Sequence, residues 1–173
     1  MRTLMLLRHA KAVPADGQIR DQDRPLAPRG QKDAPKIGAY MGKHELVPDR
    51  ALVSPSARTR ETWALLAPAL KLRPEYDERI YNASPQDILD LIQEQGTDAP
   101  TLLIVGHNPS LNHVAVGLIA TGDMDARERL LENLPTSGLV TIAFPFDDWR
   151  KLHGQAGRLT HFVTPKLIKE AAD

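Results

Sequence analysis

The chain has 173 residues, and its 22 basic and 22 acidic side chains leave a formal net charge of zero. This balance does not favour binding to nucleic acid or to a membrane surface, because both select for basic proteins. Cysteine is absent, which excludes disulfides, thiolate metal sites and cysteine nucleophiles, including those of the cysteine-dependent phosphatases. With 42% hydrophobic and 25% charged residues, the composition is typical of a globular protein, and we expect a single domain over residues 1–173.

The amino terminus carries only four successive apolar residues, 4–7, before the charged Arg8. This run is too short for a signal peptide, and every apolar run in the chain falls far short of the ~20 residues that a bilayer span needs. We therefore expect a cytoplasmic protein that does not bind membranes.

Short apolar runs predict strands, and five of them are separated by helical or turn-rich stretches. The first run, residues 4–7, is continuous and ends in a charged pair, which is typical of a strand buried on both faces. A polar stretch rich in proline and glycine follows and predicts a long loop over residues 11–28, of a length that is usually functional. The further strands are predicted at residues 51–53, 101–105, 138–144 and 159–163.

Helical spacing of apolar residues predicts four helices between these strands. They cover residues 29–43, the stretch from Ser56 to Leu70, the segment after the Ser84-Pro85 pair, and a segment that runs through Ile119 with Asn108 as its N-cap. Alternating strands and helices predict an α/β fold with a mainly parallel central sheet that is covered on both faces.

Three of the predicted strands stop at side chains that favour phosphate. Arg8 and His9 follow the first strand, Arg58 comes shortly after the second, and His107 follows the strand at residues 101–105. Because the carboxyl ends of parallel strands meet at one edge of a sheet, we expect these four side chains to form one site. Forked guanidinium donors, imidazoles and the amino terminus of the helix after His107 suit a dianion.

Phosphoryl transfer through a covalent intermediate needs a nucleophile, and histidine is the best one that this chain offers. We assign this role to His9, which must be neutral at the attacking nitrogen while an acceptor holds the other ring N–H. Arg8, Arg58 and His107 would then neutralise the phosphoryl oxygens. No carboxylate lies at ligand spacing from the histidines, so we expect no metal ion and no cofactor.

The same segments resemble the histidine phosphatase superfamily, whose fold is the phosphoglycerate-mutase-like fold. The resemblance rests on Leu7-Arg8-His9-Ala10-Lys11, on Ser54-Pro55-Ser56-Ala57-Arg58 with Thr62, and on Gly106-His107-Asn108-Pro109. The short length and further segments resemble the SixA branch of phosphohistidine phosphatases; these segments are Asp23-Arg24-Pro25-Leu26 with Arg29-Gly30, Tyr81-Asn82-Ala83-Ser84, Thr136-Ser137-Gly138 and Thr164-Pro165-Lys166.

This resemblance implies a three-layer α/β/α sandwich, a phosphorylated His9, and a phosphate pocket made of Arg8, Arg58 and His107. We further expect Arg24 and Asn108 to bind substrate. Two residues depart from the family pattern, since Ala10 stands where glycine is usual and Ala27 stands where threonine is usual.

The identity of the substrate depends on Glu78, which occupies the place of the general acid in mutase-like and sugar-phosphatase members of the family. An imidazole leaving group has a pKa of about 6.5, whereas an alkoxide resembles water at roughly 15.7, so only an ester needs the acid. A phosphohistidine phosphatase acting on a phosphorylated carrier protein is therefore our first hypothesis. The alternatives are a small-molecule phosphomonoesterase with Glu78 as its acid and an inactive phosphate-binding module.

Overall fold

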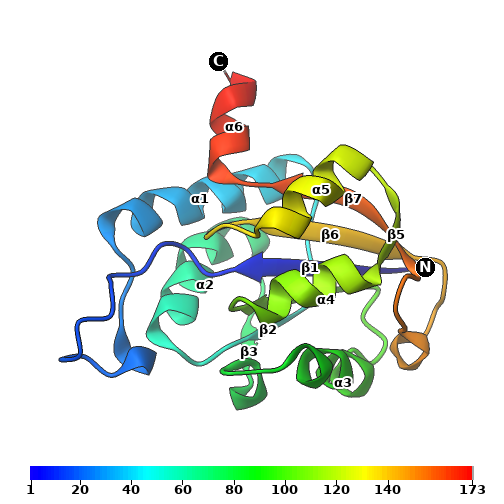
Figure 1. Ribbon diagram of the computed structural model, residues 1–173, viewed down its shortest axis with the longest axis horizontal. Helices are drawn as coiled ribbons and strands as arrows, with labels where there is room; N and C mark the ends of the chain where they lie inside the picture. Colours follow the sequence, from blue (N-terminus) through cyan, green and yellow to red (C-terminus); the bar gives the residue numbers. More distant parts are fainter. Residues whose placement is uncertain (173) are drawn as a thin grey trace.

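The computed structural model describes residues 1–172 and contains a seven-stranded sheet in the order β3-β2-β4-β1-β6-β7-β5 (Figure 1). The strands are β1 (Arg2–Arg8), β2 (Arg50–Val53), β3 (Pro74–Tyr76), β4 (Thr101–Gly106), β5 (Ile119–Gly122), β6 (Leu139–Phe144) and β7 (Gly157–Val163). β1 lies in the middle, parallel to β4 and antiparallel to β6. Four strand pairs are parallel and two are antiparallel, which confirms the mainly parallel sheet.

Six α-helices cover the two faces of this sheet: α1 (Pro28–Lys43), α2 (Ala57–Leu70), α3 (Pro85–Gln95), α4 (Ser110–Leu118), α5 (Met124–Glu132) and α6 (Pro165–Ala172). Short 3₁₀ turns occur as η1 (Asp21–Asp23), η2 (Glu78–Ile80) and η3 (Trp149–Lys151). Buried side chains of α1 and α2 form the core on one face, and those of α3, α4 and α5 form the core on the other. The three-layer sandwich is therefore confirmed.

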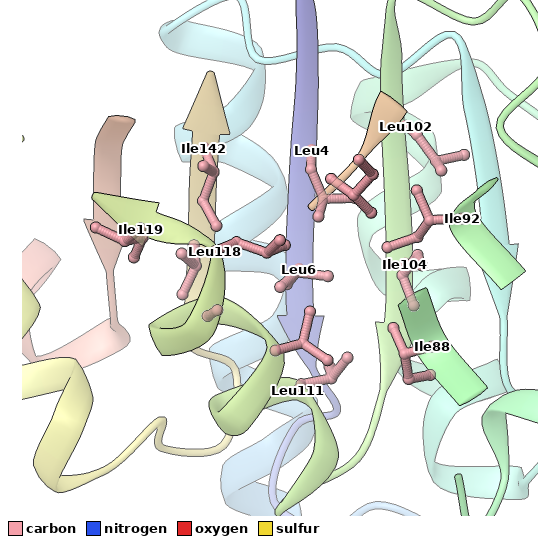
Figure 2. Packing of buried hydrophobic residues seen from close by; sticks show 14 of the residues in the cluster. Leu4, Leu6, Ile88, Ile92, Leu102, Ile104, Leu111, Leu118, Ile119 and Ile142 are labelled. Carbon is pink, nitrogen blue, oxygen red and sulfur yellow. The ribbon is translucent and has the colours of Figure 1, made fainter. Parts of the chain in front are cut away.

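The alternation of side chains along β1 explains why both faces are covered. Leu4 and Leu6 lie in the core beneath α3 and α4, whereas Met5 and Leu7 lie in the core beneath α1 and α2. Successive residues of a strand point to opposite faces, so a strand that is apolar at every position needs a helical layer on each side. Figure 2 shows Leu4 and Leu6 packed with Ile88 and Leu111 from the covering helices.

The helix after β4 begins later than expected. α4 starts at Ser110 with Pro109 as its N-cap residue, and Ile119 already belongs to β5. The prediction of Asn108 as N-cap is wrong, because its side-chain amide donates to the carbonyl of Leu134 at 2.7 Å instead of turning back to the helix. Ser84 caps α3 as expected, and Ser56 caps α2; each side chain accepts from a backbone N–H three residues on.

The strand β5 and the helices α5 and α6 were not predicted, and residues 75–83, expected to be a short strand or a loop, form the end of β3 and the turn η2. Two apolar residues of α5, Met124 and Leu131, are about half exposed, so this helix lacks a clean apolar stripe. Within the described residues, no helix combines the length and apolar character that crossing a bilayer requires.

Candidate active site

The ends of β1, β2 and β4 bring the predicted site residues together at one edge of the sheet. Leu7 pairs with Val105 in neighbouring parallel strands, and Val53 pairs with the same residue from the other side. A pocket of about 240 Å³ lies beyond these ends, lined by Arg8, His9, Lys11, Ala12, Arg24, Arg58, His107, Asn108 and Thr136. All six residues predicted to bind or react with phosphate thus line one pocket. Lys11, Ala12 and Thr136 line it as well, although no role in the site was expected for them from the sequence.

The His9 ring is held in an orientation suited to a nucleophile. Its Nδ1 lies 2.7 Å from the carbonyl oxygen of Ala10, which can only accept, so Nδ1 carries the hydrogen and Nε2 keeps its lone pair. The ring is 8% exposed, and burial lowers the pKa of His9 to about 4, with the charges of Arg8 and Arg58 adding to the effect. At neutral pH the ring is therefore uncharged and its Nε2 is available to attack.

The backbone around His9 is fixed from three sides. The N–H of His9 donates to Gly106 O at 3.1 Å, and the N–H of Ser137 lies 3.1 Å from the carbonyl oxygens of both Arg8 and His9. Ser137 adopts a positive φ of 61° in this turn. On the third side, the N–H of Ala10 donates to Thr62 Oγ1 at 2.9 Å. His9 thus lies on a short segment that neighbouring strands and α2 hold in place.

The second histidine stands beside the first. The ring centroids of His9 and His107 are 5.4 Å apart, and His107 Nε2 lies 2.8 Å from Ser54 Oγ. Burial lowers the pKa of His107 to about 3, and the neighbouring His9 and Arg58 act in the same direction. Both rings are therefore neutral in the free protein, and positive charge in the pocket comes from arginine and lysine.

Arg8 and Asn108 meet at a single carbonyl group. Arg8 Nη1 donates to Leu134 O at 3.1 Å, and Asn108 Nδ2 donates to the same oxygen at 2.7 Å. Burial lowers the pKa of Arg8, as does the charge of Arg58, but a guanidinium stays protonated at any ordinary pH. The segment before Ser137 thus orients two of the predicted phosphate ligands.

A carboxylate that binds two arginines of the pocket was not expected. Asp21 accepts from Arg58 Nη2 at 3.0 Å, from Arg24 Nε at 3.0 Å and from the Tyr81 hydroxyl. These hydrogen bonds, with that of Tyr81 the strongest, hold the pKa of Asp21 well below its usual range, so the group is ionised. The only sequence signal for this role is that Asp21 lies three residues before Arg24 in the predicted long loop, and this spacing alone does not indicate a contact with Arg58.

Glu78 does not lie in the pocket. It is exposed in η2 and is not among the lining residues, whereas Tyr81, three residues later, presents its ring edge-on to His107 at 5.6 Å between centroids. Arg60 is also exposed, with its guanidinium 4.3 Å from the centre of the Tyr76 ring. Two residues apart on α2, Arg58 and Arg60 therefore point in different directions, into the pocket and towards solvent.

Comparison with known proteins agrees with this geometry. Residues 4–98 match the family described as the histidine phosphatase superfamily (branch 1). An uncharacterized protein of Mycobacterium tuberculosis is 35% identical over 165 residues, which cover 92% of this chain and 100% of the relative. A relative from Mycobacterium leprae is 32% identical over 164 residues, with the same two shares.

Solved structures show the same arrangement of strands and helices. A SixA protein of Agrobacterium tumefaciens, assigned as a phosphohistidine phosphatase, superposes with a TM-score of 0.80 at 30% identity. The aligned region covers 95% of this chain and 98% of the Agrobacterium chain. A SixA protein of Nakamurella multipartitia with the same assignment gives 0.81 at 28% identity, with shares of 95% and 96%. The sequence match, the phosphoglycerate-mutase-like fold and the clustered histidines and arginines lead to one conclusion: this chain belongs to the histidine phosphatase superfamily.

Proposed function

We propose that the protein is a phosphohistidine phosphatase that carries the phosphoryl group on His9 during the reaction. The orientation of the His9 ring is the observation that carries this proposal. Its Nδ1 hydrogen is held by the Ala10 carbonyl, and its free Nε2 belongs to a ring that lines the pocket together with Arg8 and Arg58. A neutral imidazole nitrogen with its lone pair among cationic donors is the arrangement that attack on phosphorus requires.

In the first step, Nε2 of His9 attacks phosphorus and the P–N bond of the substrate breaks. The substrate imidazole, protonated on its other nitrogen, keeps the bonding pair and leaves as a neutral ring. His9 becomes an imidazolium that bears the phosphoryl group on Nε2 and still donates from Nδ1 to Ala10 O. Arg8, Arg58 and His107 contact the phosphoryl oxygens, so this transfer needs no metal ion.

In the second step, water attacks the phosphorus on His9 and the P–Nε2 bond breaks. Nε2 recovers its lone pair, the ring becomes neutral again, and dihydrogen phosphate leaves. Because the hydrogen stays on Nδ1 throughout, the phosphorylated ring is an activated leaving group in this step. The Ala10 carbonyl thus serves both the attack and the release.

The carboxyl groups near the pocket favour a phosphoramidate over a phosphate ester. Glu78 is exposed and lies outside the lining residues, and the pKa of Asp21 is held below its usual range by Tyr81, Arg58 and Arg24. Glu78 is not placed, and Asp21 is not protonated, to donate to an alkoxide, whose conjugate acid has a pKa of roughly 15.7. An imidazole, at about 6.5, departs without such help.

We further propose that the substrate histidine belongs to a protein. A volume of about 240 Å³ accommodates a phosphoryl group and part of an imidazole ring, and lies below the 300–1,000 Å³ that is common for pockets enclosing a whole small molecule. The assignment of the SixA proteins from Agrobacterium and Nakamurella as phosphohistidine phosphatases supports the same substrate class. The cytoplasmic location expected from the sequence stays a prediction.

The decisive experiment compares two substrate classes at equal concentration. The protein is incubated with a histidine-phosphorylated carrier domain and, separately, with a set of sugar phosphates, and released phosphate is measured. We expect kcat/KM to be higher for the phosphorylated carrier. Equal or faster hydrolysis of the esters would identify a phosphomonoesterase, and phosphate binding without turnover of either substrate would identify a binding module.

The covalent step is tested by trapping. Labelled substrate is mixed with the protein, the reaction is stopped without acid, and the label is located by peptide mapping. We expect it on His9 in the wild type and in the His113→Gln control, since His113 is exposed on α4, and we expect none in His9→Gln. Label on a different residue of the wild type would refute the mechanism.

A further inference from the structure

Ser54 connects two of the three strand ends that build the pocket. It follows β2 directly, its side chain is fully buried, and its Oγ lies 2.8 Å from Nε2 of His107, which follows the neighbouring parallel strand β4. Among residues 1–172, this ring nitrogen is the only hydrogen-bond partner of the Ser54 hydroxyl. The other ring nitrogen, Nδ1, is shielded from water and has no partner in the same part of the chain.

The direction of the Ser54–His107 hydrogen bond decides which ring nitrogen carries the single hydrogen of the neutral imidazole. If Nε2 donates to Ser54, then Nδ1 carries only a lone pair. If Ser54 donates to Nε2, then Nδ1 carries the hydrogen and can donate it elsewhere. In the free pocket the two arrangements leave equal numbers of donors and acceptors without partners, so the free pocket does not select between them.

An incoming phosphate does select between them. Since Nε2 is occupied by Ser54, Nδ1 is the nitrogen of His107 that remains for a phosphate oxygen. A lone pair on Nδ1 would repel that oxygen, whereas an Nδ1–H would donate to it and satisfy a buried group that is otherwise unpaired. Of the two neutral arrangements, only the one in which Ser54 donates is compatible with a phosphate ligand.

We infer that Ser54 is a positioning residue, which donates its hydroxyl hydrogen to Nε2 of His107 and so keeps the imidazole hydrogen on Nδ1 for a phosphate oxygen. This role rests on the proposed function to the extent that the pocket must bind phosphate, but not on the identity of the leaving group. Both histidines then carry their single ring hydrogen on Nδ1. A backbone carbonyl keeps the hydrogen of His9 on Nδ1 and frees Nε2 for attack, and a hydroxyl keeps the hydrogen of His107 on Nδ1 for binding.

Nitrogen-15 NMR of the histidine side chains tests this inference, with inorganic phosphate as the probe and the His107→Gln variant to assign the signals. In the phosphate-saturated wild type at pH 7, we expect His107 to show a protonated Nδ1 and an unprotonated Nε2. A ring protonated on Nε2 alone, or on both nitrogens, would overturn the inference. This measurement needs no variant at position 54 and no turnover. Its result therefore tests the inference about Ser54 separately from the proposed substrate.

Substitution of Ser54 tests the consequence. In Ser54→Ala, we expect a mixture of His107 tautomers and a dissociation constant for phosphate that is about tenfold higher, which corresponds to the loss of one hydrogen bond. Ser110→Ala is the matched control, because Ser110 is a buried hydroxyl that also bonds to His107, but to its backbone carbonyl at 3.0 Å. We expect Ser110→Ala to leave the tautomer unchanged, and equal effects of the two substitutions would contradict the inference.

Discussion

Asp21 holds the Arg58 guanidinium at two points: its carboxylate accepts from Nη2 at 3.0 Å, and its backbone carbonyl accepts from Nη1 at 2.7 Å. Arg58 is itself nearly buried, and its Nε has no partner among residues 1–172. The long loop before α1 therefore fixes the orientation of an arginine on α2. The hydrogens of Arg58 that Asp21 does not engage remain for the phosphate that we propose the pocket binds.

From this contact we predict that Asp21→Asn lowers kcat/KM about tenfold. An amide keeps the size of the side chain but gives weaker, uncharged hydrogen bonds to Arg58 and Arg24, so both guanidinium groups become less ordered. The rate is measured on the phosphorylated carrier domain. Asp23→Asn is the control, since the Asp23 carboxylate pairs with exposed Arg20 at 3.9 Å, and a similar loss in both variants would contradict the assigned role.

Removal of Arg58 itself should be far more damaging. We expect Arg58→Ala to reduce kcat by roughly 10² or more, because it deletes a charged donor to the transferring phosphoryl group. Arg60→Ala should stay near the wild-type rate, since Arg60 is exposed and stacks on Tyr76. Steady-state kinetics of both variants measure the contrast, and an unchanged rate for Arg58→Ala would remove this residue from the site.

Thr62 joins the segment that carries His9 to α2 through one hydroxyl. Its Oγ1 accepts from Ala10 N at 2.9 Å and donates to Arg58 O at 2.7 Å. Thr62→Val leaves a buried N–H without a partner, which costs about 1–3 kcal/mol of folding free energy, and we expect a lower kcat with little change in KM. Thr62→Ser keeps the hydroxyl and should retain most of the activity. Urea unfolding and kinetics together distinguish this result from a general loss of structure.

Both active-site histidines should make the protein less stable in mild acid. Their folded pKa values of about 4 and about 3 lie below the usual 6.5, so the unfolded chain takes up these protons first as the pH falls. The contribution of these neutral histidines to the free energy of unfolding is present above pH 6.5 and is lost as the pH falls towards 4. For His9 alone the expected loss between pH 7 and pH 5 is about 2 kcal/mol.

Urea unfolding of the wild type and of His9→Gln at these two pH values measures the effect. The variant should lose less stability on acidification than the wild type, whereas His113→Gln, with an exposed ring, should behave like the wild type. Parallel losses in all three proteins would show that His9 is not buried in its neutral form.

Two glycines give opposite expectations for the same substitution. A Cβ on Gly30, in the first turn of α1, would lie 2.2 Å from the carbonyl oxygen of Lys11, so Gly30→Ala must displace the segment that follows His9. A Cβ on Gly117, at an exposed position of α4, meets nothing within 4 Å. We expect Gly30→Ala to lower both Tm and activity, and Gly117→Ala to stabilise the protein by up to about 1 kcal/mol. Thermal melting and one activity assay test the pair.

The pocket was largely predictable because each of its main residues lies close in sequence to the strand that positions it. Arg8 and His9, Arg58, and His107 each follow an apolar run directly or within a few residues, and the geometry of a parallel sheet then brings them together. Asp21 was not predictable, since its role arises only when the loop folds back onto α2. The cap assigned to Asn108 failed for the same kind of reason, because its amide finds a carbonyl 26 residues further along the chain.

The central position of β1 also governs the order in which the site can form. Thr3 pairs with Thr101 and Leu7 pairs with Leu139, so the strand that delivers His9 must wait for partners encoded much later in the chain. Contacts between segments so distant in sequence slow folding, because the chain loses the entropy of closing long loops before the strand pairs can stabilise it. A ribosome-bound chain that ends before β6 would already contain His9, Arg58 and His107 yet lack the antiparallel neighbour of β1, so we expect the ability to bind phosphate to appear only after residue 144 has been synthesised.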